Sequence, residues 1–334
     1  MTTASLLLIT TTFSVNSEKS DKDENNAANC LRNIVAECAK QLRETPTARE
    51  QALSILREWI YQNTDIKNVR QDEPFLLRFL RYKKYSIPMA QQTLLKYLSL
   101  RKYYPEIFKN IDSEDPRLQE IINDGYIVVS PVRDNKGQQV IVYRMNKLNI
   151  QKFTCWDICR VHALIYESLV DDPTNQICGF CHVGDGNGAS GAHIAMWNPT
   201  DFARLMKWGE QSIPMRHKDF HFINVPAGMK YIIDFAISKT KPKFADRIHL
   251  YSNLSQLHKR MDVNCLPSVF GGNIKFEDML DYTKQLISEH RKKILGLDDM
   301  EILSTRGIRS SRGKNQANGD VTSVEGSFRK LEID

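Results

Sequence analysis

The sequence predicts an α/β protein in which a mixed, mostly parallel sheet is flanked by helices and preceded by a small all-α domain. Three observations carry this prediction. Up to about residue 115, apolar residues recur at helical spacing. After residue 121, short strand-like runs alternate with helical segments. The chain has 334 residues and is 41% hydrophobic, which is enough apolar material for a sizeable core.

The N-terminal helical region is identified by the spacing of its apolar residues. Leu31 and Ile34 are three residues apart, which is the spacing of neighbours on one face of a helix. Asp72 has a side chain suited to an N-cap, and Pro74 stands where the first turn of the following helix would lie. Residues 30–115 are therefore expected to form a domain of about three to four helices.

The sheet is predicted from strand-like runs further along the chain. Residues 126–129 and 140–143 flank the turn sequence Asp-Asn-Lys-Gly at 134–137, which indicates a hairpin. A helix from about 156 to 170 follows, and residues 176–183 have the pattern of a further strand. This alternation of helices and strands is typical of parallel pairing.

The segment that follows has an unusual helix between two strand-like runs. The runs are 220–225 and 247–251, and the helix is predicted over 227–238. Lys230 and Asp234 are its only charged residues, so apolar side chains cover most of its circumference. A surface helix confines them to one stripe. A helix buried on all sides fits this pattern, and so does a helix between the protein and a lipid-like ligand or membrane.

Basic residues lie directly before and after this helical segment. Apolar surface beside concentrated positive charge is attracted to anionic membranes, although a run of charge also fits an ordinary solvated face. The residues concerned are Arg216, Lys218, Lys239, Lys241, Lys243 and Arg247.

The two ends of the chain are polar and are expected to be mostly disordered. Residues 1–29 are interpreted as a disordered leader, because their short apolar run has no basic residue before it and is much shorter than a membrane-spanning helix. A last amphipathic helix is predicted over 278–295. Residues 298–334 form the tail.

Composition narrows the functional class. A net charge of +6 with 26% charged residues is only mildly basic, so a nucleic-acid partner is not expected. The seven cysteines show no zinc or disulfide spacing and fit the reduced thiols of a cytoplasmic protein. Any membrane contact is expected to be peripheral.

An enzyme is the first alternative that the sequence raises. Gly184 to Gly188 is glycine-rich, but it lacks the Lys-Ser/Thr of a phosphate-binding loop and is interpreted as a plain loop. The histidines show no metal-ligand spacing, and His221 and His249 alternate with apolar residues as structural strand residues do. No enzymatic activity is expected, and no metal or cofactor is expected either.

Several ordered motifs carry a family resemblance. FLLRFLRYKKYS, NKGQQVIVYR, HFINVP, RIHLY and LPSVFGGN follow one another at matching spacing over residues 45–295. In this the chain resembles the CRAL-TRIO (Sec14-like) family. Within the family it is most similar to the branch of α-tocopherol transfer, retinaldehyde-binding and clavesin-like proteins, and is expected to be an insect member.

The resemblance implies a lipid-binding domain, assigned here to residues 116–297, with a deep apolar pocket beneath a lid helix at about 227–239. The ligand is expected to be a hydrophobic lipid, either a retinoid, a tocopherol-like molecule or another lipid. A monomer is expected. The residues assigned to the lid and pocket are Phe202, Phe222, Met229, Tyr231, Ile232, Ile233, Phe235, Ala236 and Ile237.

The resemblance also implies recognition of a phosphoinositide headgroup by basic residues beside the lid. The matching positions are Lys83, Arg216, Lys218, Lys243 and Arg247. The implied function is lipid transfer to or from phosphoinositide-containing membranes, with transient association with endosomal or other intracellular membranes. The alternative is a phosphoinositide-binding adaptor that carries no lipid.

Overall fold

The computed structural model describes residues 21–196, 198–305 and 308, with side chains from residue 28 onward. Its main sheet has five strands in the order β2-β3-β4-β5-β6. β2 is antiparallel to β3, and every other neighbouring pair is parallel, so the predicted mixed, mostly parallel sheet is confirmed. The strands are β2 (Ile127–Val129), β3 (Gln139–Arg144), β4 (Phe180–Asp185), β5 (His217–Ile223) and β6 (Ile248–Tyr251).

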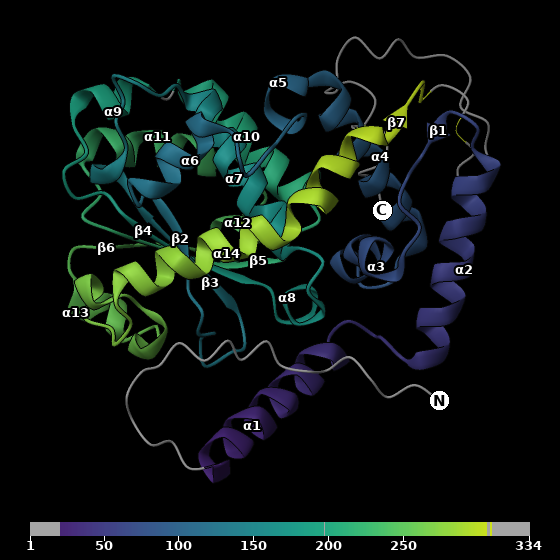
Figure 1. Cartoon of the computed structure of the whole chain (residues 1–334), viewed down its shortest axis with the longest axis horizontal. Coiled ribbons are helices and arrows are strands. Elements are labelled where there is room, and N and C mark those ends of the chain that lie inside the picture. Colours follow the sequence, from purple (N-terminus) through teal and green to yellow (C-terminus); the bar gives the residue numbers. More distant parts are fainter. Residues whose placement is uncertain (1–20, 197, 306–307, 309–334) are drawn as a thin grey trace.

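Helices cover both faces of the sheet, and the alternation of side chains along β3 shows the two layers. Ile141 and Tyr143 join the apolar cluster that contains the residues of α7, whereas Val140 and Val142 join the cluster that contains Met279 of α14. Figure 1 shows α14 running across the sheet. The first layer holds α7 (Cys155–Leu169), α9 (Gly191–Ala195), α10 (Pro199–Gln211), α11 (Ala227–Ile237) and α12 (Pro242–Ala245), and the second holds α13 (Leu254–His258) and α14 (Phe276–Leu295).

The predicted N-terminal helices form beside the sheet, but five helices of the described residues begin before residue 116, more than the three to four expected. Asp72 is the N-cap of α3 and accepts a hydrogen bond from the Phe75 amide at 3.3 Å, with Pro74 in the first turn. Thr45 caps α2 in the same way, at 3.1 Å from the Ala48 amide. The helices are α1 (Asp21–Lys40), α2 (Pro46–Gln62), α3 (Glu73–Tyr82), α4 (Ile87–Tyr103), α5 (Pro105–Phe108) and α6 (Pro116–Asn123).

The two chain ends fall largely outside the described residues, but their described parts are regular. α1 begins at Asp21, inside the stretch interpreted as a leader. In the tail, β7 (Glu301–Ile302) pairs antiparallel with β1 (Ile66–Lys67). The C-terminal segment therefore returns to the helical region. Residues 1–20, 306–307 and 309–334, on which most of the predicted disorder falls, are not described.

One predicted strand boundary is wrong. The sequence indicates a strand over 176–183, but the structure has a short helix, α8 (Pro173–Cys178), before β4 begins at Phe180. Asp172 caps this helix by accepting a hydrogen bond from the Asn175 amide at 2.7 Å. Gly179, with φ of +90°, ends it. Capping and glycine geometry therefore outweigh the apolar run that suggested a longer strand.

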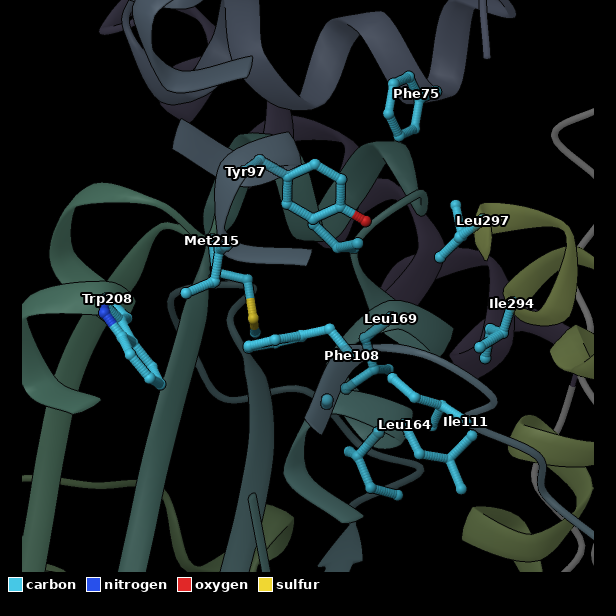
Figure 2. Close-up of a cluster of buried hydrophobic side chains, with 14 of the residues drawn as sticks. Phe75, Tyr97, Phe108, Ile111, Leu164, Leu169, Trp208, Met215, Ile294 and Leu297 are labelled. Atoms are coloured by element: carbon cyan, nitrogen blue, oxygen red, sulfur yellow. The ribbon is translucent and has the colours of Figure 1, made fainter. Parts of the chain in front are cut away.

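The helical region and the α/β region share one apolar core. Figure 2 shows side chains from α3 and α4 lying in one cluster with side chains from α7, α10 and the C-terminal segment. Such a shared core positions the end of α3 relative to the sheet. The labelled members are Phe75, Tyr97, Phe108, Ile111, Leu164, Leu169, Trp208, Met215, Ile294 and Leu297.

Ion pairs join α3 to the α/β region along a line that we call the arginine seam, made of Arg78, Arg81 and their partners. The Arg78 side chain is fully buried and contacts Asp171 and Glu167, the latter at 2.7 Å. Arg81 is held by Glu44 at 2.7 Å and by the Gln176 side chain at 2.8 Å. The guanidinium charges of this seam are therefore matched by carboxylates.

Candidate lipid site and basic surface

The helix α11 has a buried apolar side and an exposed side on which Tyr231 lies with Lys230 and Asp234. Ile232, Ile233 and Ala236 are buried, whereas Tyr231 is 66% exposed. The hypothesis of a helix buried on all sides is therefore excluded. Of the other residues assigned to the lid and pocket, Phe202, Phe222, Met229, Phe235 and Ile237 are half-buried.

Aromatic rings form a row across the sheet on the side of α7 and α11. The Phe220 ring stacks on the His182 ring at 4.5 Å and 10°, and Tyr143 stacks on the other side of His182 at 5.8 Å and 11°. Phe222 extends the row, 6.4 Å from Phe220. A Cβ atom at Gly184 would lie 2.6 Å from the Phe222 ring, so only glycine admits this ring position.

A chain of hydrogen bonds joins tyrosines and histidines on the same face of the sheet. We call it the hydrogen-bonded chain. It begins with Tyr126 Oη and His162 Nε2 at 3.0 Å, and continues from His162 Nδ1 to Tyr166 Oη at 3.1 Å. It then runs from Tyr166 to Tyr143 (3.1 Å), from Tyr143 to His182 Nδ1 (2.6 Å) and from His182 Nε2 to His217 Nδ1 (2.8 Å).

The members of the hydrogen-bonded chain are neutral at physiological pH because they are buried. Burial lowers the pKa of His162 to about 4 and, together with the charge of Arg247, lowers the pKa of His217 to about 3. Burial raises the pKa of Tyr166 to about 12. The pKa of His182 is well below its usual value, first because of burial and then because His217 lies beside it.

Basic side chains meet where β5 and β6 begin. Arg216 directly precedes β5, Lys218 lies in it, and Arg247 directly precedes β6. These strands are parallel neighbours, so residues far apart in sequence come to the same edge of the sheet. Burial lowers the pKa of Lys218, and the charges of Arg216 and Arg247 act in the same direction, which places the three cations close together.

The end of α3 brings a second group of cations to the same region. Lys83 is the C-cap residue of α3. Burial lowers its pKa to about 8, and the charges of Lys96 and Lys241 add to the effect. The charge of Arg247 acts to lower the pKa of Tyr82, so the two side chains are neighbours. We call Lys83, Lys96, Arg216, Lys218, Lys241 and Arg247 the basic surface.

The structure therefore brings together most of the basic residues that the sequence indicated, and it adds others. Lys83, Arg216, Lys218 and Arg247 are members of the basic surface. Lys243 is exposed on α12, two residues beyond Lys241. Lys96 was not indicated by the sequence, because it lies on α4 far from the lid segment and no local motif marks it.

Several of these cations have no carboxylate partner within the described residues. There, neither Lys83, Arg216, Lys218 nor Arg247 forms an ion pair. Two of them, Arg216 and Arg247, donate hydrogen bonds to backbone oxygens. Arg216 donates from Nη1 to the carbonyl oxygens of Ile177 and, at 3.4 Å, of Gln176, at the C-terminal end of α8. Arg247 donates to the His217 carbonyl oxygen.

Two further features bear on the functional class. Across the described ranges, no group of three or more His, Cys, Asp or Glu side chains is arranged to hold a metal ion. In the same part of the chain, no helix combines the length and the apolar character needed to cross a bilayer. The glycine-rich stretch 184–188 ends β4 and forms a turn, as the plain-loop interpretation predicts.

Comparisons with known proteins match two stretches of the chain to family models. Residues 123–272 match the family model described as "CRAL/TRIO domain", and residues 45–118 match the model described as "Pinta-like, UBA domain". A solved structure entitled "Crystal structure of Sfh5" is similar with a TM-score of 0.46 and 11% sequence identity, covering 75% of this chain and 99% of that one.

Curated relatives cover most of the chain. Clavesin-1 of Xenopus laevis is 29% identical over 248 residues, which is 74% of this chain and 75% of the relative. Alpha-tocopherol transfer protein-like of Mus musculus is 28% identical over 258 residues, 76% of this chain and 74% of the relative. Clavesin-2 of Homo sapiens is 27% identical over 248 residues, 74% of this chain and 76% of the relative.

Proteins with this domain typically bind or transfer hydrophobic lipids and are not enzymes, which matches the expectation drawn from the sequence. The matched domain spans all five strands of the main sheet together with α11. Residues 123–272 are therefore a CRAL-TRIO domain, and the chain is related to the clavesins and to alpha-tocopherol transfer protein-like at 27–29% identity.

Proposed function

We propose that this protein carries a hydrophobic lipid in a hollow beneath α11 and exchanges it with phosphoinositide-containing membranes. The observation that carries the proposal is the position of α11. Its inner side is buried, its outer side exposes Tyr231, and basic residues lie close to it in sequence on both sides. A helix of this kind is suited to cover an apolar ligand and to meet a membrane when it moves.

The exposure of alternate residues along β5 supports a hollow on the α11 side of the sheet. On one face of this inner strand, His221 and Ile223 are only 4% and 1% exposed. On the other face, Phe220 and Phe222 keep accessible surface, although α10, α11 and α12 lie on that side (Figure 1). Apolar side chains that stay accessible beneath a covering layer are expected where space remains for a guest.

His162 and Tyr166 of α7 support the same location. Both are desolvated strongly enough to shift their pKa values, yet both keep accessible surface. A group that is surrounded by protein and still accessible is expected at the wall of an internal space. A lipid placed there would gain about 25 cal/mol per Å² of apolar surface removed from water.

The basic surface is proposed as the membrane-docking site. Burial and like charges together lower the pKa of Lys83, so this lysine is held at a cost in free energy. Bound phosphate groups would reduce that cost, because they place negative charge among the cations. Each basic residue near an anionic membrane contributes about 1 kcal/mol to association.

Docking and exchange are then coupled through α11. We infer that phosphate binding at the basic surface holds the protein against the membrane while Tyr231 and its neighbours enter the interfacial layer. The relation to clavesins favours transient association with endosomal or other intracellular membranes. The protein acts as a monomer in this proposal.

Lipid extraction tests the carrier function. The full chain is purified without detergent, and bound lipids are identified by mass spectrometry under native and denaturing conditions. A carrier releases a stoichiometric hydrophobic lipid only on denaturation. If the protein holds no lipid and takes none up from vesicles, but still sediments with phosphoinositide vesicles, it is the adaptor considered above and the carrier proposal fails.

A further inference from the structure

The hydrogen-bonded chain ends at an atom that has no partner in the described part of the protein, the Nε2 of His217. This side chain is 4% exposed, and its Nδ1 is already engaged by His182 at 2.8 Å. A Cβ added to Gly209 of α10 would lie 3.8 Å from Nε2, so the nitrogen faces that helix. Phe220 and Phe244, with ring centres 5.5 and 6.5 Å away, make the surroundings apolar.

The six side chains of the hydrogen-bonded chain do not have enough groups to give Nε2 of His217 a hydrogen-bond partner. Each of the six neutral side chains has one proton to donate, and five hydrogen bonds join them. If Tyr126 donates to His162 and the bonds run onward, His217 keeps a spare Nε2–H. If the bonds run the other way, Nε2 is a bare acceptor and the Tyr126 hydroxyl is spare.

In both directions, therefore, Nε2 of His217 has no hydrogen-bond partner within the described residues, although its side chain is only 4% exposed. Polar groups in such surroundings usually have a hydrogen-bond partner. The partner is expected to be part of a ligand, since Nε2 lies on the side of the sheet where the hollow is proposed. This step rests on the proposed carrier function.

We propose that Nε2 of His217 binds the polar head of the lipid, and that this head is an uncharged oxygen group, a hydroxyl or a carbonyl. A hydroxyl can accept from Nε2–H or donate to bare Nε2, so it fits both directions of the chain. A carbonyl oxygen accepts from Nε2–H in the first direction.

A charged head fits this position less well. The histidines of the hydrogen-bonded chain are neutral because they are buried, so they offer no countercharge. Arg247 is the cation whose charge acts on His217, but its Nη1 donates to the His217 carbonyl oxygen. A carboxylate would lose its hydration without a dedicated cation, and that loss is larger than for an uncharged oxygen.

The test is a competition among lipids of one chain length. The full chain is offered hexadecanal, hexadecanol, hexadecane and hexadecanoate in equal amounts, and the bound lipids are measured by mass spectrometry. The wild type is expected to prefer the aldehyde and the alcohol to the hydrocarbon by about fivefold, the ratio for one net hydrogen bond.

Matched variants assign the preference to His217. His217→Asn keeps a polar group that can pair with His182 but lacks an atom at the Nε2 position, so the preference is expected to fall to about one. His221→Asn is the control. It makes the same change on the opposite face of the same strand, where His221 bonds Tyr251 at 2.9 Å, and the preference is expected to persist.

Each other outcome has a defined meaning. Equal binding of oxygenated lipid and hydrocarbon by the wild type, tighter binding of hexadecanoate, or an equal loss in both variants would overturn the assignment of His217. In each of these cases the wild type still binds a lipid, so the carrier function stands. If no lipid binds, the carrier function itself fails and this inference fails with it.

Discussion

The arginine seam and the basic surface use the same kind of side chain in opposite ways. Arg78 is fully buried, and two carboxylates contact its guanidinium group. Arg216 and Lys218 are only half-buried, and within the described residues neither forms an ion pair. The difference teaches that the pairing of a cation, more than its burial, separates the structural role of the seam from the binding role proposed for the basic surface.

The pKa shifts follow the same division. Burial opposes the charge of Arg78, but the carboxylates of Asp171 and Glu167 outweigh it and raise the pKa above its usual value. Burial also opposes the charge of Lys83, and there the neighbouring charges of Lys96 and Lys241 add to the effect, so the pKa falls to about 8. The charges of the seam are paired within the protein, whereas the basic surface is proposed to be stabilised by an added anion.

The largest effect is expected from breaking the seam. Arg78→Ala leaves Asp171 and Glu167 buried without their main cation, and should lower the free energy of unfolding by roughly 3–5 kcal/mol. Urea denaturation measures it. Arg49→Ala, which removes an exposed ion pair with Glu73, is the control and should cost less than about 1 kcal/mol. Similar losses in the two variants would refute the distinction.

Acidification should affect the hydrogen-bonded chain before it affects the seam. Below pH 6.5 the unfolded chain protonates its histidines, whereas folded His217 stays neutral to about pH 3 and His162 to about pH 4. Each such histidine therefore lowers the free energy of unfolding by about 1.4 kcal/mol per pH unit as the pH falls through this window. The pKa of Asp171 is depressed, so the seam keeps its charge until the pH falls below 3.8.

The measurement is urea denaturation at pH 6.5 and pH 5. The wild type should lose stability over this interval, and His217→Asn, which removes one such histidine, should lose about 2 kcal/mol less. An equal loss in both proteins would show that His217 does not stay neutral in the folded state.

A smaller effect is expected from the exposed side of α11. Tyr231→Ala removes an aromatic ring that is proposed to enter the membrane interface, and should slow lipid transfer severalfold while changing stability by less than about 0.5 kcal/mol. Tyr61→Ala, on the 81% exposed tyrosine of α2, is the matched control and should leave transfer unchanged. If both variants slow transfer equally, α11 has no special role.

Local patterns in the sequence were sufficient to predict many of the helices and strands, including α11. Asp72 and Pro74 mark the start of α3, and the apolar side chains that cover most of the circumference of residues 227–238 mark α11. The strand expected over 176–183 shows the limit of such patterns, because Asp172 and Gly179 outweigh the apolar run.

The contacts between distant segments could not be predicted from the sequence. The charge of Lys241 lowers the pKa of Lys83, although four of the five strands of the main sheet lie between the two residues in sequence. The hydrogen-bonded chain links Tyr126 to His217 through residues of three strands and a helix, and no spacing rule marks it. Such contacts depend on strand order and register, which local patterns do not specify.

Carriage of the lipid and docking to the membrane are proposed to depend on different residues. A transfer assay on a charge-reversed protein tests this most directly. Lys218→Glu combined with Lys243→Glu alters the proposed docking side without disturbing the backbone contacts of Arg216 and Arg247. The control, Lys259→Glu with Arg260→Glu, makes the same charge change at the end of α13. Charge reversal of Arg216 and Lys218 should also weaken docking, with an added loss of stability because Arg216 holds the end of α8.

Lipid-loaded proteins are mixed with vesicles that contain or lack phosphatidylinositol bisphosphate. The lipid retained by the protein and the lipid transferred to the vesicles are both measured in each sample. The Lys218/Lys243 variant should retain its lipid as the wild type does and transfer it to phosphoinositide vesicles at least tenfold more slowly, while the control matches the wild type. Retention and transfer falling together, or neither falling, would contradict the account.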